Sequence, residues 1–67
     1  MRYIEYSKKL QAIKDMAEHR RTGTPRQLAE KLEVSERTAE RMVEHLRDSG
    51  VPITYNRYRS SYEINEK

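Results

Sequence analysis

Apolar residues recur at a helical period along most of the chain. In the first stretch they are separated by intervals of three and four residues, at Tyr3, Tyr6, Leu10, Ile13 and Ala17. Lysines, glutamates and other polar residues occupy most of the positions between them. This pattern predicts an amphipathic helix over about residues 4–20, with Gly23 either ending it or forming part of its exit turn.

A second helix has a clear beginning. Thr24 is a capping residue, Pro25 suits the first helical position, and Gln27 stands three residues after the cap. The helix is predicted over about residues 25–33, with a buried stripe of Leu28, Ala29 and Leu32. It is barely two turns long, so it requires packing against other elements to be stable.

A third helix follows almost at once. Ser35 is its predicted N-cap, Gly50 its stop, and it spans about residues 36–49. Its inward positions are Ala39, Val43 and Leu46, with Met42 near the edge, either at the core margin or in a contact surface. Only residues 33–35 separate it from the second helix. Such a short connection forces the sharp corner of a helix-turn-helix.

After Gly50 the apolar period changes from 3.6 to two. Strands are predicted over about residues 52–56 and 61–65, joined as a β-hairpin, although no Asn-Gly type turn signal joins them. Their apolar positions are Ile53, Tyr55, Tyr62 and Ile64. Two strands alone are marginal, so this face is expected to pack on the helices.

Composition limits the protein to one small domain with a thin core. The chain has 67 residues, of which 11 are Leu, Ile or Val, and the net charge is +3. No apolar run approaches the roughly 20 residues of a membrane span, and cysteine is absent. We expect a cytoplasmic protein without membrane, metal or cofactor. No catalytic constellation stands out, so an enzyme is not expected.

The residues around the sharp turn resemble a known family. Residues 27–38 read QLAEKLEVSERT, similar to the LAexLxVSxRT core of bacterial winged-helix regulators, and Arg41, Leu46 and the GVPI of residues 50–53 continue the similarity. The pattern resembles the DNA-binding domains of the biotin-repressor group and of regulators that carry a WYL-type ligand domain. The resemblance implies a mainly α fold with a small β-hairpin, a three-helix winged helix-turn-helix over residues 1–67.

The same resemblance implies transcriptional regulation through double-stranded DNA, with the third helix in the major groove and the hairpin as a wing on the backbone or minor groove. The positions that match DNA-facing ones in the family are Ser35, Arg37, Thr38, Glu40 and Arg41. Three positions depart from the family: Glu33 replaces a common glycine, Glu40 a frequent arginine and Met42 a frequent aspartate. Glu33 either adopts a positive φ, at a cost of about 1 kcal/mol, or uses another turn geometry.

Helical geometry gives an independent view of the same surface. With Ala39 at the centre of the buried face, Arg37, Arg41, Glu44 and Asp48 point outward, Thr38 and His45 lie on one flank, and Glu40 on the other. Basic and aromatic side chains at the wing tip, and arginines near the second helix, are further candidates for phosphate contact. The full predicted DNA-binding set is Ser35, Arg37, Thr38, Glu40, Arg41, His45, Arg57, Tyr58, Arg59, Arg26 and Arg21.

Two alternatives remain open at the level of sequence. Residues 36–48 carry four acidic and three basic side chains, so the third helix could instead serve a protein-protein interaction module. Near the N-terminus, Tyr3, Ile4 and Tyr6 either extend the packing of the first helix or form an apolar patch for a homodimer.

Overall fold

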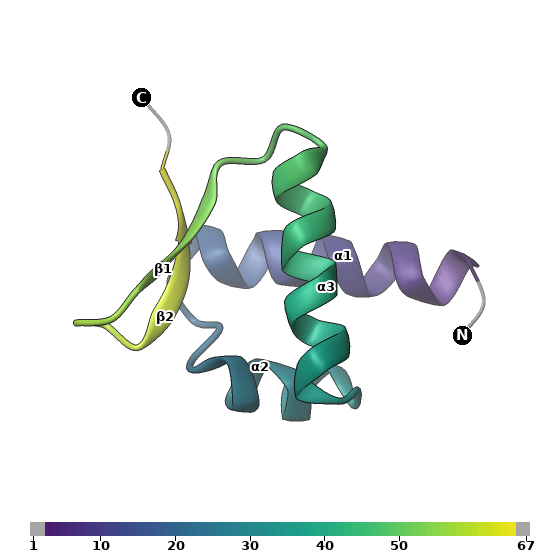
Figure 1. The fold of residues 1–67 in the computed structure, drawn as a ribbon, viewed down its shortest axis with the longest axis horizontal. Coiled ribbons are helices and arrows are strands. Elements are labelled where there is room, and N and C mark those ends of the chain that lie inside the picture. The colour runs from purple at the N-terminus through teal and green to yellow at the C-terminus, as the bar shows by residue number, and fades with distance from the viewer. Residues whose placement is uncertain (1–2, 66–67) are drawn as a thin grey trace.

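Three helices and one hairpin make up the chain in the computed structural model, which describes residues 3–65 (Figure 1). The elements are α1 (Tyr3–Glu18), α2 (Pro25–Leu32), α3 (Glu36–Asp48), β1 (Ile53–Asn56) and β2 (Ser61–Ile64). In Figure 1, α1 runs behind α3, α2 lies below α1 beside the lower end of α3, and the hairpin stands to one side. This arrangement confirms the predicted winged helix-turn-helix, with element bounds within about two residues of those expected.

The start of α2 follows the sequence signal closely. The Thr24 hydroxyl accepts the Gln27 N–H at 3.2 Å, and the Gln27 side chain accepts the Thr24 N–H at 2.8 Å, which completes the capping box. Pro25 occupies the first helical position. Gly23, at φ 74°, lies in the preceding turn, where a β-carbon would collide with the Gln27 side chain. Glycine is therefore required there by both backbone conformation and space.

The end of α1 comes two residues earlier than predicted, at Glu18. Arg20 adopts a left-handed conformation (φ 55°), and the Arg21 N–H donates to the Met16 carbonyl at 2.8 Å. A second bond, from Arg20 N–H to Ala17 O at 3.1 Å, completes a Schellman motif. The helix thus ends on an arginine where glycine is usual, which is why periodicity alone placed its end too late.

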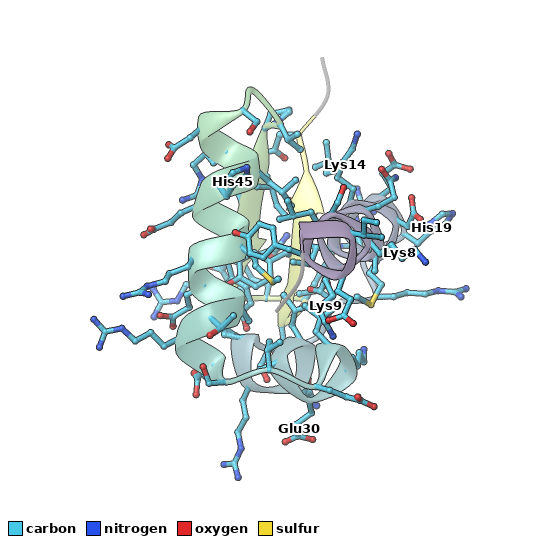
Figure 2. All side chains as sticks on the ribbon, turned by 90° about the vertical axis from the view of Figure 1, so that its right-hand side faces the viewer. Lys8, Lys9, Lys14, His19, Glu30 and His45 are labelled. Carbon is cyan, nitrogen blue, oxygen red and sulfur yellow. The ribbon has the colours of Figure 1, made fainter. Side chains whose placement is uncertain are left out.

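The turn between α2 and α3 places Glu33 at a positive φ, which is the more costly of the two geometries expected for it. Glu33 has φ 58° and ψ 42°, so this glutamate adopts the left-handed conformation that favours glycine. The Val34 N–H donates to the Ala29 carbonyl at 3.0 Å across the turn. From α1, the Lys9 ammonium donates to the Leu32 carbonyl, and Figure 2 shows Lys9 reaching down toward α2. A cation on the last carbonyls of α2 favours this corner through the helix dipole.

The hairpin has the predicted register for one apolar face. Ile53 pairs with Ile64 and Tyr55 with Tyr62, so all four side chains lie on the same side of the sheet. The two tyrosine rings meet edge to face, with centroids 5.0 Å apart. This face packs against the helices, as a two-stranded sheet requires for stability.

Every element contributes to the core. Its buried members are Ile13, Ala17, Leu28, Leu32, Met42, Val43, Leu46, Ile53 and Tyr62. Four other residues predicted to face inward, Leu10, Val34, Val51 and Ile64, are partly buried around it. Met42 is 0% exposed, so it belongs to the interior and not to a contact surface. The few large apolar residues are therefore nearly all used, and the thin core is continuous.

A buried polar contact joins the wing to the α1–α2 connection. Thr22 is 0% exposed, and its hydroxyl oxygen accepts the Tyr62 N–H at 2.7 Å. The same oxygen lies 3.0 Å from the hydroxyl of Ser61, which is also buried. Thr22 thereby satisfies a backbone donor on the free edge of β2, which would be costly to leave unpaired.

Removing this acceptor is expected to destabilise the domain. Thr22→Val keeps the shape but leaves the Tyr62 N–H buried without a partner, which should lower the free energy of unfolding by about 1–3 kcal/mol. Thr22→Ser retains the hydroxyl and is the matched control, expected to lose less. Urea denaturation followed by circular dichroism measures both, and equal stability of the valine and serine variants would contradict this role.

Candidate nucleic-acid interface

The outward face of α3 carries two unpaired cations. Arg37 and Arg41 are exposed, stand one helical turn apart and lie opposite the buried face formed by Ala39, Met42, Val43 and Leu46. Figure 2 shows nitrogen-tipped side chains projecting from the side of α3 that faces away from α1. Neither arginine forms an ion pair with any other of residues 3–65. Both guanidinium groups are therefore available to an external anion or base edge.

The N-terminus of α3 lies at the exposed end of the sharp turn. The Ser35 hydroxyl accepts the Thr38 N–H at 3.1 Å and donates to the Thr38 hydroxyl oxygen at 2.9 Å. Ser35 is thus confirmed as the N-cap, and its hydroxyl hydrogen is already used. The remaining donors for an anion at this end are the first backbone N–H groups of the helix and the Thr38 hydroxyl hydrogen.

His45 lies on the flank of α3 nearest α1. Its ring meets that of Tyr6 edge to face, with centroids 5.8 Å apart and planes at 80°. Figure 2 shows it in the upper part of α3, far along the helix from the N-terminal end. The structure therefore gives the His45 ring an intramolecular contact, one helical turn beyond Arg41.

Glu40 lies on the opposite flank, facing the wing. Its side chain is exposed. Burial of the Tyr62 ring, and then the negative charge of Glu40, raise the pKa of the Tyr62 phenol above its usual 10.0. Tyr55 and Glu36 act in the same direction, while Arg47 opposes them. On a helical projection Glu40 falls on the same flank as Arg47, whose Nε–H donates to the Ile53 carbonyl at the start of β1.

Arg47, which the sequence reasoning did not include, supports the wing. Its Nε–H donates to the Ile53 carbonyl at 3.1 Å, at the start of β1. On a helical projection Arg47 falls on the same flank as Glu36 and Glu40, but the projection does not show that the hairpin lies beside that flank. The bond ties the start of β1 to the C-terminal part of α3.

The wing tip is preorganised by a single side chain. The Asn56 carboxamide oxygen accepts the N–H groups of Tyr58 at 2.9 Å and Arg59 at 3.2 Å, and Ser60 turns the chain with φ 50°. This Asx turn replaces the Asn-Gly turn that the sequence lacks. Tyr58 is fully exposed and Arg57 and Arg59 flank it, also exposed. An aromatic ring between two cations thus projects from the tip.

The arginines near α2 are placed differently from one another. Arg26 pairs with Glu30 one turn later, at 3.7 Å, and both side chains are largely exposed. Arg21 is exposed, and its carbonyl accepts the Lys31 ammonium at 2.6 Å. Arg20 pairs with Glu63 of β2 at 3.3 Å. Of these three, only Arg21 has a side chain without an ion pair within the described part of the chain.

Residues 3–65 contain neither a metal-binding group of side chains nor a membrane-spanning helix. Among residues 3–65, no group of three His, Asp or Glu side chains stands close enough to hold a metal ion. In the same part of the chain, no helix combines the length and apolar character needed to cross a bilayer.

Comparison with known proteins identifies the family. Residues 9–63 match the family model described as an HTH domain, which is most of the chain. The chain belongs to the HTH domain family. Helix-turn-helix domains of this kind bind DNA, and the match spans α2, α3 and the hairpin that this geometry places around the outward arginines. No curated protein and no solved structure showed a significant match to the HTH domain described here.

Proposed function

We propose that this HTH domain is a sequence-specific reader of double-stranded DNA and acts as a small bacterial transcriptional regulator or accessory DNA-binding factor. The observation that supports it best is the pair of exposed arginines, Arg37 and Arg41, one turn apart on α3 with no ion pair inside residues 3–65. Each guanidinium can bridge guanine O6 and N7 or hold a phosphate through two bonds. Such a protein would work in the cytoplasm, on the nucleoid.

In this proposal α3 enters the major groove with its N-terminal half toward the base edges. Arg37 and Arg41 then face the groove, while the first N–H groups behind Ser35 meet a phosphate. Thr38 offers its hydroxyl hydrogen on the flank nearest α1. His45, held against Tyr6, stands further along the helix, where it could reach only the edge of the same contact.

The wing supplies a second point of contact. Arg57, Tyr58 and Arg59 are exposed at a tip whose backbone already donates two hydrogen bonds to Asn56, which lowers the cost of ordering it on binding. Contacts of this kind to backbone or minor groove position a protein without reading sequence. Arg21 and Arg26 could contact phosphates beyond the start of α2, with Arg26 first releasing Glu30.

The charge distribution along the chain makes individual arginines, including those of the wing, important for binding. Residues 1–34 carry a formal charge of +3 and residues 35–67 carry none, so the positive balance lies mostly outside α3. Binding must then depend on a few placed arginines more than on bulk charge. A titration of mixed genomic duplex at low salt tests the proposal. Absence of any binding would contradict it.

The wing contact makes a separate prediction. Arg59→Ala is expected to weaken binding to all duplexes alike and to reduce the slope of log affinity against log salt by about one, because one phosphate contact is lost. Lys8→Ala is the matched control, since Figure 2 shows Lys8 on the side of α1 away from α3. A change in sequence preference with Arg59→Ala, or an equal loss with Lys8→Ala, would argue against a phosphate-contacting wing.

A second function is favoured by one observation. The acidic side chains Glu36, Glu40, Glu44 and Asp48 are all exposed along α3. An HTH domain used as a protein-protein interaction module would present this stripe to a basic partner. Chemical shifts of α3 that respond to a co-purifying protein and not to DNA would support this alternative.

Self-association remains a proposal as well. Ile4 is 66% exposed, whereas Tyr6 is half-buried with its ring on His45, and the side chain of Tyr3 lies outside the described residues. The exposed Ile4 side chain supports a contact with a second copy. Two copies on DNA would select a palindromic motif from random duplexes, because the symmetry of the site mirrors that of the protein.

A further inference from the structure

The reading helix contains side chains that DNA should repel. Three arginines and four acidic residues give residues 36–48 a formal charge of −1. Each carboxylate that enters the groove loses hydration and meets a field of phosphates. A carboxylate on α3 must therefore remain in solvent or find a hydrogen-bond donor on the DNA.

Position along the helix distinguishes one of these carboxylates from the others. Glu36 lies in the first turn, where the helix dipole favours negative charge whatever the function. Glu44 and Asp48 lie in the C-terminal half, beyond the residues that usually reach base edges. Glu40 directly precedes Arg41 and follows Arg37 by three residues, so it shares their part of the helix.

The surroundings of Glu40 leave its carboxylate without a protein partner. The side chain is exposed, and within residues 3–65 it accepts no hydrogen bond and forms no ion pair, even though Arg37 stands three residues earlier, at a spacing suited to helical pairing. On a helical projection it falls on the same flank as Arg47, whose Nε–H donates to the Ile53 carbonyl at the start of β1. In the proposed docking, with α3 in the major groove and the wing on the backbone, this flank borders the base edges.

The chemistry of an ionised carboxylate selects the base. A carboxylate only accepts hydrogen bonds, and the donors in the major groove are the amino groups of cytosine N4 and adenine N6. Adenine places its N7 acceptor beside the amino group, and guanine offers acceptors only. We propose that Glu40 reads a cytosine in the target site, beside the bases contacted by Arg37 and Arg41. This inference rests on the proposed function.

The experiment is a selection of bound sequences from random duplex DNA with the full chain, Glu40→Gln and Glu44→Gln. The unaltered protein should yield a motif with cytosine at one position. Glu40→Gln should replace that cytosine by adenine, because a glutamine amide pairs with adenine N6 and N7. All other positions should persist, and Glu44→Gln, which removes the same charge one turn later, should leave the whole motif unchanged.

Affinities for two duplexes that differ only at this base pair make the test quantitative. The unaltered protein should prefer the cytosine duplex by about tenfold, and Glu40→Gln should prefer the adenine duplex. Glu40→Ala should lose the cytosine preference without gaining another.

Three outcomes would overturn the inference in distinguishable ways. An identical motif from the unaltered protein and Glu40→Gln would show that Glu40 reads no base, while the proposed function stands. Tighter binding of Glu40→Gln to every duplex alike would show that the carboxylate acts only by repulsion. If the unaltered protein enriches no motif at all, sequence-specific binding fails and the inference fails with it.

Discussion

Replacing Arg37 and Arg41 together by alanine is expected to abolish sequence-specific DNA binding at moderate salt. Each arginine should contribute about 1–3 kcal/mol if it bridges a guanine, and both are exposed, so neither truncation disturbs the core. Fluorescence anisotropy with the selected duplex measures the loss. Circular dichroism should show an unchanged fold, since surface substitutions away from special features alter stability by about 0.5 kcal/mol or less.

A matched double variant separates placed contacts from bulk charge. Lys8→Ala with Lys14→Ala removes the same two charges from α1, and neither lysine forms an ion pair among residues 3–65. This variant should bind the selected duplex slightly more weakly and with unchanged preference. If the two double variants lose affinity equally, Arg37 and Arg41 act only through net charge, and α3 is not the reading helix.

Local chemistry made the helix starts predictable. The Thr24 capping box and the Ser35 cap are bonds between a side chain and a backbone group three residues away, so the sequence contains both partners. The apolar period likewise identified the inward face of α3. These features depend on neighbours within about one helical turn, which is the range over which pattern reasoning is informative.

Features that depend on distant residues were not predictable in the same way. Thr22 reads as an ordinary loop residue, and only its position against β2, about forty residues later, gives its hydroxyl a structural role. Arg20 and Glu33 adopt left-handed backbone without being glycine, because hydrogen bonds of the surrounding turns hold them there. The role of Thr22 thus depends on a tertiary contact, whereas the bonds around Arg20 and Glu33 are local and the conformation of these two residues runs against the preference of their side chains.

In the candidate site, too, features set within one helix were predictable and features set by packing between elements were not. The outward direction of Arg37 and Arg41 followed from helical geometry, whereas the contact of His45 with Tyr6 required the packing angle of α1 on α3. The hydrogen bond from Arg47 to Ile53 required the path of the chain after Gly50. The direction in which a side chain points around one helix follows from the sequence, but the elements that pack beside each flank of the helix do not.

Met42→Ala is expected to be the most damaging single substitution for stability. The side chain is 0% exposed at the centre of the core, and truncation of a buried methionine costs about 2–5 kcal/mol. A domain of this size has about 3–10 kcal/mol of stability in total, so this substitution removes a large share of it and the melting temperature should fall steeply. Met42→Leu, nearly equal in volume, should cost less than about 1.5 kcal/mol. Thermal denaturation measures both.

The same variant separates folding from recognition. Met42 lies on the face of α3 opposite Arg37 and Arg41, so Met42→Ala should weaken DNA binding only by lowering the folded fraction. Because DNA binds the folded state, saturating duplex should raise the melting temperature and recover the unaltered sequence preference. If Met42→Ala instead changes the preferred motif while remaining folded, the core face of α3 adjusts the reading face, and the two surfaces are not independent.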